Sequence, residues 1–214
     1  MDTPQIEFWS GSFGKEYTDR NPQNLQEWDR LYMNNFGILK TQMNEEFIGM
    51  LDRNIRILEV GCNIGLQLQG LQKMGFQNLY GIELQQYAVE KGKSLSTGIN
   101  IIQGSGFDIP FKDSYFDLVY TAGVLIHIAP EDLSQIMREI IRCSRKYIWG
   151  FEYYSKENKE VNYRGNKGYL WKMDFSRKFL SVEPGLKEVK RKIYPYITGA
   201  EQGNEDMMYL LEIV

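Results

Sequence analysis

One short segment, at residues 58–65, limits the possible folds of this chain more than any other. It has the sequence Leu-Glu-Val-Gly-Cys-Asn-Ile-Gly, and it joins an apolar run at 56–60 to a helical pattern at 66–74. A buried strand that turns through glycines into a helix is typical of open α/β sheets, in which free N–H groups of the helix face a ligand. We expect Gly61 and Gly65 to let the backbone turn tightly and approach that ligand.

The rest of the chain alternates between strand and helix patterns. Such alternation implies a mostly parallel sheet with helices on both faces, and we expect residues 1–214 to form one domain. Apolar runs predict seven strands, at 56–60, 78–82, 100–103, 116–122, 146–153, 186–194 and 207–214. Helical spacing predicts helices at 25–52 (one or two, broken at Gly37), 66–74, 85–94 and 130–143.

Two segments lack such a pattern. Residues 1–24 are rich in Gly, Ser, Asn and aromatic residues, so we expect a loop or lid there. Together with the helices expected at 25–52, this segment forms the N-terminal part of the domain, at 1–52. The ligand-binding core then spans 53–153. Residues 154–180 are polar, aromatic and basic, and they are expected to form a loop insertion that contacts the substrate, followed by C-terminal strands at 181–214.

The charge beside the glycine loop argues against a phosphate ligand. The loop lacks the three glycines of a Gly-x-Gly-x-x-Gly motif, and the carboxylate of Glu59 would repel a pyrophosphate. A second acid, Glu83, ends the second expected strand, where a pair of ribose hydroxyls would be held. S-adenosylmethionine (SAM) fits these features better than a dinucleotide, because it carries an amino group and a sulfonium centre but no phosphate.

A third segment, Ser105-Gly106-Phe107, follows the third expected strand and offers an apolar wall for an adenine ring. The order of glycine loop, acid and this segment resembles the class I SAM-dependent methyltransferases over about residues 50–150. The resemblance implies a Rossmann-like fold with the last strand antiparallel, SAM as cofactor and S-adenosylhomocysteine (SAH) as product. The cofactor contacts it implies are Glu59, Gly61, Asn63, Gly65, Glu83, Leu84, Ser105, Gly106, Phe107 and Ala122. Two departures are Ser105, where many of these enzymes have an acid, and Asn63, which replaces the middle glycine.

Three aromatic residues near the N-terminus, Trp9, Phe13 and Tyr17, are further candidates for the cofactor site. An aromatic face near the sulfonium gives an attraction of about 0.5–2 kcal/mol. The glycines between these residues favour a mobile lid. The alternative is that the three rings only hold the N-terminal segment on the core.

The flanks narrow the resemblance to the methylases associated with pseudaminic acid biosynthesis. The segments that carry it are 8–21, 123–128, 152–168 and 204–206, so it covers nearly the whole chain. It implies an acceptor that is a nonulosonic acid sugar or its nucleotide-activated form. Arg can hold the carboxylate or phosphate of such an acidic sugar with two hydrogen bonds. The expected substrate-binding residues are Tyr153, Tyr154, Tyr163, Arg164 and Lys167, although a solvated charged loop would have a similar composition.

Two residues are candidates for the general base that removes a proton from a hydroxyl or ammonium acceptor. His127, the one histidine of the chain, follows the fourth expected strand at the edge where open α/β folds place their active site. Its ordinary pKa near 6.5 suits a base at neutral pH. Glu152, at the end of the fifth strand, is the second candidate. His127 could instead be a packed residue before the next helix.

Composition weighs against other functions. The net charge is −3, and long nucleic-acid footprints need a basic face, so we expect no nucleic-acid partner. We expect no membrane span, because no run of about 18 apolar residues occurs. We also expect no metal, and reduced cysteines in a cytoplasmic protein. Two alternatives stay open: methylation of a protein or amino-acid side chain, and a SAM-binding regulatory module without turnover.

Overall fold

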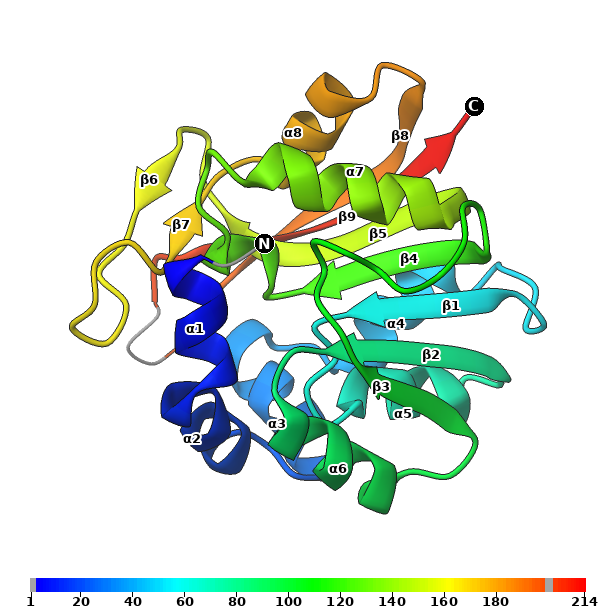
Figure 1. Ribbon diagram of the computed structural model, residues 1–214, viewed down its shortest axis with the longest axis horizontal. Coiled ribbons are helices and arrows are strands. Elements are labelled where there is room, and N and C mark those ends of the chain that lie inside the picture. Colours follow the sequence, from blue (N-terminus) through cyan, green and yellow to red (C-terminus); the bar gives the residue numbers. More distant parts are fainter. Residues whose placement is uncertain (1–2, 199–201) are drawn as a thin grey trace.

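A seven-stranded sheet forms the middle layer of the protein. The computed structural model describes residues 3–198 and 202–214, and in it the strands lie in the order β3-β2-β1-β4-β5-β9-β8 (Figure 1). The first five pair in parallel, whereas β9 runs antiparallel to both of its neighbours. This confirms the expected sheet with its last strand antiparallel. The strands are β1 (Arg56–Val60), β2 (Asn78–Glu83), β3 (Ile99–Gln103), β4 (Phe116–Ala122), β5 (Ser144–Tyr154), β8 (Leu186–Pro195) and β9 (Glu205–Ile213).

Helices cover both faces of the sheet, and each face has its own apolar core (Figure 1). One core contains buried residues of α7 (Leu133–Cys143) and α8 (Phe175–Val182). The other contains buried residues of α4 (Lys40–Ile48), α5 (Leu66–Lys73) and α6 (Gln86–Leu95). Because successive side chains of a strand point to opposite faces, both faces of β1 and β4 are buried, as the unbroken apolar runs predicted.

Most expected elements agree with the structure to within a few residues. The predicted helical region at 25–52 is two helices, α3 (Leu25–Phe36) and α4. The break lies at Gly37, which has φ +69° and donates its N–H to the carbonyl of Met33. Such a left-handed residue ends a helix without the steric strain that a side chain would add.

Two expectations about loops were wrong. The described part of segment 1–24 is not a loop: α1 (Pro4–Ser10) and α2 (Ser12–Arg20) form there, with Thr3 capping α1 through the N–H of Ile6. The segment 154–180 is also partly ordered into β6 (Lys159–Glu160) and β7 (Trp171–Lys172), which pair as a hairpin, and its end belongs to α8. Side-chain capping and ring packing stabilise these short elements, and composition alone does not reveal either.

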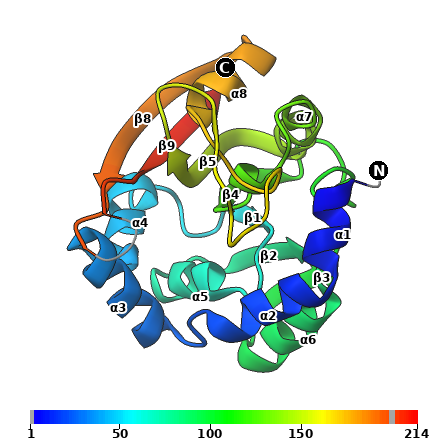
Figure 2. The same cartoon turned by 90° about the vertical axis from the view of Figure 1, so that its left-hand side faces the viewer.

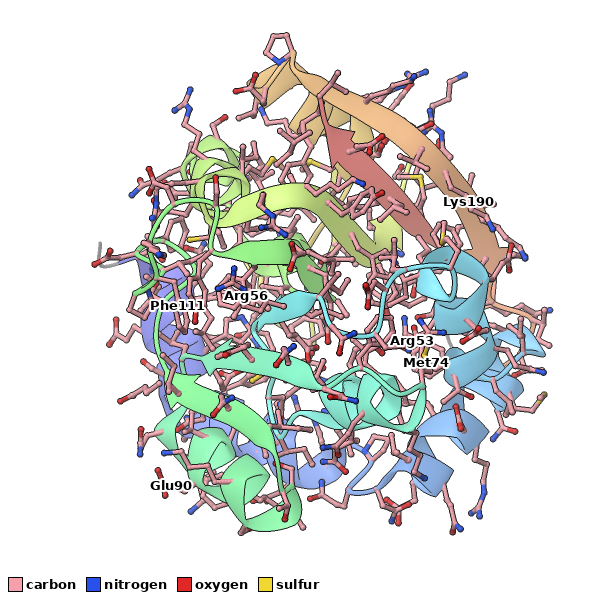
Figure 3. All side chains as sticks on the ribbon, turned by 90° about the vertical axis from the view of Figure 1, so that its right-hand side faces the viewer. Arg53, Arg56, Met74, Glu90, Phe111 and Lys190 are labelled. Carbon is pink, nitrogen blue, oxygen red and sulfur yellow. The ribbon has the colours of Figure 1, made fainter. Side chains whose placement is uncertain are left out.

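The two N-terminal helices, called the lid helices from here on, lie at the carboxyl edge of the parallel strands (Figures 1 and 2). Gln85, just beyond β2, donates to the carbonyls of Ser10 and Gly11 at 2.8 Å each, and Asp19 of α2 accepts from Tyr87 and Lys91 of α6. Figure 3 shows the opposite edge, where Arg56 at the start of β1 lies. Among the residues that the structure describes, no helix is long and apolar enough to cross a membrane.

The crossing of the lid helices depends on Gly14. A Cβ at this position would lie 1.8 Å from the backbone oxygen of Trp9, and backbone cannot move aside as a flexible side chain can. Gly14→Ala is therefore expected to lower the free energy of unfolding by about 1–3 kcal/mol, although alanine normally stabilises a helix relative to glycine. Gly70→Ala, in α5, is the matched control, because the nearest atom there is 3.4 Å away. Denaturant unfolding of both variants measures their free energies of unfolding. If the two variants are equally stable, the crossing of the lid helices does not depend on Gly14.

Candidate functional site

A cavity of about 300 Å³ lies beneath the lid helices, at the carboxyl ends of the parallel strands. Many residues expected in the site line it: Trp9, Tyr17, Glu59, Gly61, Asn63, Glu83, Leu84, Ser105, Gly106, Phe107, Ala122 and His127. Other expected residues do not line it: Phe13, Gly65, Glu152, Tyr153, Tyr154, Tyr163, Arg164 and Lys167. The glycine loop, both of its acids and the histidine are thus brought to one place.

The glycine loop is held by Glu83. One carboxylate oxygen accepts from the N–H of Asn63 at 2.8 Å, and the other accepts from the N–H of Gln85 at 2.9 Å. Asn63 has φ +48° between Gly61 and Gly65, each at φ +75°, so the loop curls around the end of this acid. Burial raises the pKa of Glu83, and these N–H donors act in the opposite direction. Glu83 therefore fixes the loop and still faces the cavity with acceptor lone pairs.

Glu59 brings a buried carboxylate with unused hydrogen-bonding capacity to the cavity. Its side chain is 4% exposed, and its Oε2 atom has no hydrogen-bond partner among the described residues. Burial raises the pKa of Glu59 to about 8. A buried carboxylate oxygen that accepts no hydrogen bond is costly, so this position favours a ligand that brings a cation or a hydrogen-bond donor.

The far end of the cavity is apolar. Phe107, Ile128 and Ile136 line it together with Ile6 of the lid. The N–H of Phe107 donates to Ser105 Oγ at 3.2 Å, so this segment forms a compact turn after β3. A flat, largely apolar ring system suits such walls. Sequence reasoning identified Phe107 but missed the three isoleucines, which come from distant parts of the chain.

His127 faces the cavity from the short 3₁₀ turn η1 (Leu125–His127). Its Nδ1 atom lies 2.7 Å from the carbonyl oxygen of Tyr169. Because a carbonyl can only accept, Nδ1 carries the proton and Nε2 keeps a lone pair. Burial lowers the pKa of His127 to about 4, so the ring is neutral at physiological pH. A neutral, oriented imidazole can accept a proton from a bound molecule.

Aromatic rings surround His127. The ring of Trp9 lies 4.5 Å away and that of Tyr163 lies 5.0 Å away, measured between centroids. Phe13 does not reach the cavity, but it stacks on Phe8 at 4.0 Å and contacts Trp9 at 5.4 Å. These contacts give His127 an aromatic surrounding made by the lid helices and by the turn that Tyr163 closes.

Glu152, the second candidate base, is buried away from the cavity. Its carboxylate oxygens accept from the N–H groups of Val124 at 3.3 Å and Ile126 at 3.4 Å. These amides belong to the turn that carries His127. The geometry gives Glu152 a supporting position, in which it holds that turn to β5.

The expected substrate residues lie outside the cavity, on the side of the hairpin. Tyr163 and Asn166 close a tight turn whose central residues are Arg164 (φ +51°) and Gly165 (φ +87°). Left-handed backbone is unusual for arginine. Lys167 is exposed, and Tyr153 and Tyr154 end β5.

Arg20, at the end of α2, does not line the cavity, but it packs on the aromatic rings of α2 and was missed by sequence reasoning. Its guanidinium carbon lies 4.8 Å from the ring centroid of Phe13 and 5.3 Å from that of Tyr17. Burial raises the pKa of Tyr17 to about 12, whereas the charges of Arg20 and Arg164 act in the opposite direction. The lining residues that were missed include Gln5, Thr18, Asn21, Trp28, Tyr32, Gln67 and Gln85.

Comparison with known proteins agrees with this geometry. Residues 58–147 match the family model for a methyltransferase domain. The chain is 28% identical over 98 residues to a sterol 24-C-methyltransferase of Aspergillus fumigatus and 28% identical over 107 residues to cycloartenol-C-24-methyltransferase 1 of Oryza sativa. These matches cover 43% and 44% of this chain but 26% and 30% of the relatives, so the chain spans less than a third of their length.

The fold matches over a longer range. The crystal structure of a SAM-dependent methyltransferase from Anabaena variabilis superposes with a TM-score of 0.70 at 11% identity, covering 100% of this chain and 96% of that one. At this identity the likeness concerns the fold alone, and the matched domain at 58–147 contains the glycine loop and the acids that face the cavity. Residues 58–147 thus match a methyltransferase domain, and the whole chain has the fold of a solved SAM-dependent methyltransferase.

Proposed function

We propose that this chain transfers a methyl group from SAM to a hydroxyl or amino group of a small acidic molecule. The acceptor class proposed is a nonulosonic acid sugar, free or activated with a nucleotide. The observation that carries the proposal is the placement of two arginines beside the aromatic rings of the site: Arg20 lies 5.3 Å from the ring of Tyr17, and Arg164 is in the turn closed by Tyr163, whose ring lies 5.0 Å from that of His127. Neither has a carboxylate partner among the described residues. The sequence resemblance of the flanking segments to pseudaminic acid-associated methylases supports the same class.

The residues that line the cavity suit the cofactor. The free Oε2 of Glu59 can accept from the amino group of SAM, and Glu83 can accept from its ribose hydroxyls. The apolar walls at Phe107, Ile128 and Ile136 suit the adenine ring. When bound, SAM supplies an electrophilic methyl group on a sulfonium.

The remaining chemistry belongs to the protein. His127 Nε2 accepts the proton that the acceptor loses, because Nδ1–H is held by the carbonyl of Tyr169. Trp9 and Tyr163 exclude water around this atom. The supporting bonds from Glu152 keep the His127 turn in place. The two guanidiniums hold the acid group of the acceptor at the mouth of the cavity.

The test is a turnover assay that counts SAH. Purified chain and SAM are incubated with free nonulosonic acids, their CMP-activated forms, neutral amino sugars of similar size, and peptides. Turnover of the acidic sugars alone supports the proposal. Turnover of peptides would favour the side-chain alternative, and SAH binding without turnover of any acceptor would favour a non-catalytic module.

The arginine pair gives a separate prediction. Arg164→Gln and Arg20→Gln are each expected to raise KM for the acidic acceptor about 10- to 100-fold, because a hydrogen bond to a charged group contributes about 1.5–3 kcal/mol. The dissociation constant for SAH should change less than about threefold. Arg138→Gln, an exposed arginine of α7, is the matched control. If the KM for a neutral acceptor rises in these variants as much as the KM for the acidic acceptor, the assigned role of the arginines is contradicted.

A further inference from the structure

A second hollow lies on the surface where the lid helix α2 meets α3 (Figure 2). It has a volume of about 360 Å³ and is called the outer pocket from here on. Three of its lining residues, Asn21, Pro22 and Leu31, also line the cavity, so the two hollows adjoin. None of the residues proposed to hold the cofactor lines the outer pocket. It can therefore receive another group while the cofactor site is filled.

The outer pocket carries more positive than negative charge. The guanidiniums of Arg20 and Arg30 line it. Its carboxylate, that of Glu27, is already engaged: one oxygen accepts from the backbone N–H of Gln23 and the other from the side-chain amide of Asn24, each at 2.8 Å. Neither arginine forms an ion pair within the part of the chain that the structure describes. Two planar guanidiniums without a carboxylate partner suit the oxygens of a phosphate.

The outer pocket also has an apolar part. Leu31 of α3 is 39% exposed, and it lines the pocket together with Pro22. The side chains of Asn21 and Asn34 add amide groups that can donate and accept hydrogen bonds. An apolar surface with a few polar groups at its border suits a flat, polar ring. A phosphate next to such a ring is the chemistry of a nucleoside monophosphate.

Aromatic contacts lead from the proposed base to the outer pocket. The ring of Trp9 lies 4.5 Å from that of His127 and 5.1 Å from that of Tyr17, measured between centroids. The ring of Tyr17 in turn lies 5.3 Å from the guanidinium carbon of Arg20. Trp9, Tyr17 and His127 all line the cavity, and Arg20 lines the outer pocket. One extended molecule can therefore reach from His127 to the outer pocket.

We propose that the outer pocket binds the nucleoside monophosphate of an activated sugar, and that this activated form is the acceptor. The inference deepens the proposed function and rests on it. Arg20 and Arg30 hold the phosphate, which leaves Arg164, in the turn closed by Tyr163, for the carboxylate of the sugar. A free sugar acid has no phosphate, so it leaves the outer pocket empty.

The first experiment needs no turnover. CMP, cytidine and inorganic phosphate are titrated into protein saturated with SAH, which keeps them out of the cofactor site. We expect CMP to bind at least about 10-fold more tightly than cytidine or phosphate, because only CMP occupies both the charged and the apolar part of the pocket.

Arg30→Gln tests whether this binding takes place in the outer pocket. It should weaken CMP about 10-fold, the lower end of what a hydrogen bond to a charged group contributes. The dissociation constant for SAH should change less than about threefold, because Arg30 does not line the cavity. Arg138→Gln, on the exposed side of α7, is the matched control and should change neither ligand.

The second experiment compares acceptors. The kcat/KM for the CMP-activated sugar should exceed that for the free sugar, and Arg30→Gln should reduce this preference about 10-fold. A preference for the free sugar, or CMP binding that Arg30→Gln leaves unchanged, would overturn the proposal. Phosphate that binds as tightly as CMP would indicate an adventitious anion only and would overturn it as well. If no acceptor of any class is methylated, the proposed function fails, whereas the titration still decides whether the outer pocket binds a nucleotide.

Discussion

Replacing His127 with asparagine is expected to lower kcat by about 10²- to 10⁴-fold, the usual contribution of a general base. Asparagine suits the test, because its amide N–H can replace Nδ1–H as the donor to the Tyr169 carbonyl, while nothing replaces the lone pair of Nε2. The orientation of the turn is thereby preserved. The affinity for SAH should change less than about threefold, which separates loss of the base from loss of the site.

The pH profile of kcat provides an independent check on His127. Burial lowers its pKa to about 4, so the neutral form that can accept a proton is present at every pH well above that value. With both substrates saturating, kcat should stay level from pH 8 to about 5 and fall only below that. A histidine with an ordinary pKa would already lose half of its activity near pH 6.5. A descending limb at that pH, or a His127→Asn variant with more than about a tenth of the original kcat, would rule out the assigned role.

Glu83→Gln is expected to weaken SAH binding by about 100-fold or more. Glu83 joins the two halves of the loop through the N–H groups of Asn63 and Gln85, and hydrogen bonds to a charged group contribute about 1.5–3 kcal/mol each. In glutamine one of the two accepting oxygens becomes an NH₂ group, which faces another donor. A loss of about 3 kcal/mol corresponds to about two decades in the dissociation constant.

The control for this change is Glu90→Gln, on the exposed side of α6, where the carboxylate pairs with Lys93 at the surface (Figure 3). It should leave the affinity unchanged. SAH and 5′-methylthioadenosine both contain the ribose, so Glu83→Gln should weaken the binding of each. Isothermal titration with both ligands measures this, and an affinity within threefold of the original would show that neither the loop nor the ribose depends on Glu83.

The central part of the fold could be predicted because burial leaves a direct trace in the sequence. β1 and β4 are covered on both faces, so their residues form unbroken apolar runs, and the observed limits of these two strands are the predicted ones. The glycine loop and Glu83 could be located for the same reason, since each adjoins such a strand. These parts of the site are fixed by local sequence and by the order of the strands.

The lid helices could not be recognised by composition, because glycines and polar residues interrupt short helices. Two signals were nevertheless present: Thr3 followed by Pro4 is a favourable helix start, and Trp9, Phe13 and Tyr17 are spaced by four. The apolar lining residues Ile6, Ile128 and Ile136 were missed for another reason. They come from distant parts of the chain, and no periodicity in the sequence indicates that they meet at one cavity.

Tyr169 connects the lid to the chemistry. Its ring packs on Phe8 of α1 at 4.2 Å, and its carbonyl accepts from His127. The neighbouring carbonyl, that of Gly168, accepts from Gln5 of the same helix. Any movement that separates α1 from this segment also disturbs the acceptor that orients the imidazole. The contacts that hold α1 over the cavity are therefore the same ones that orient His127, so under the proposed function a displacement of α1 would both uncover the cofactor site and release the imidazole.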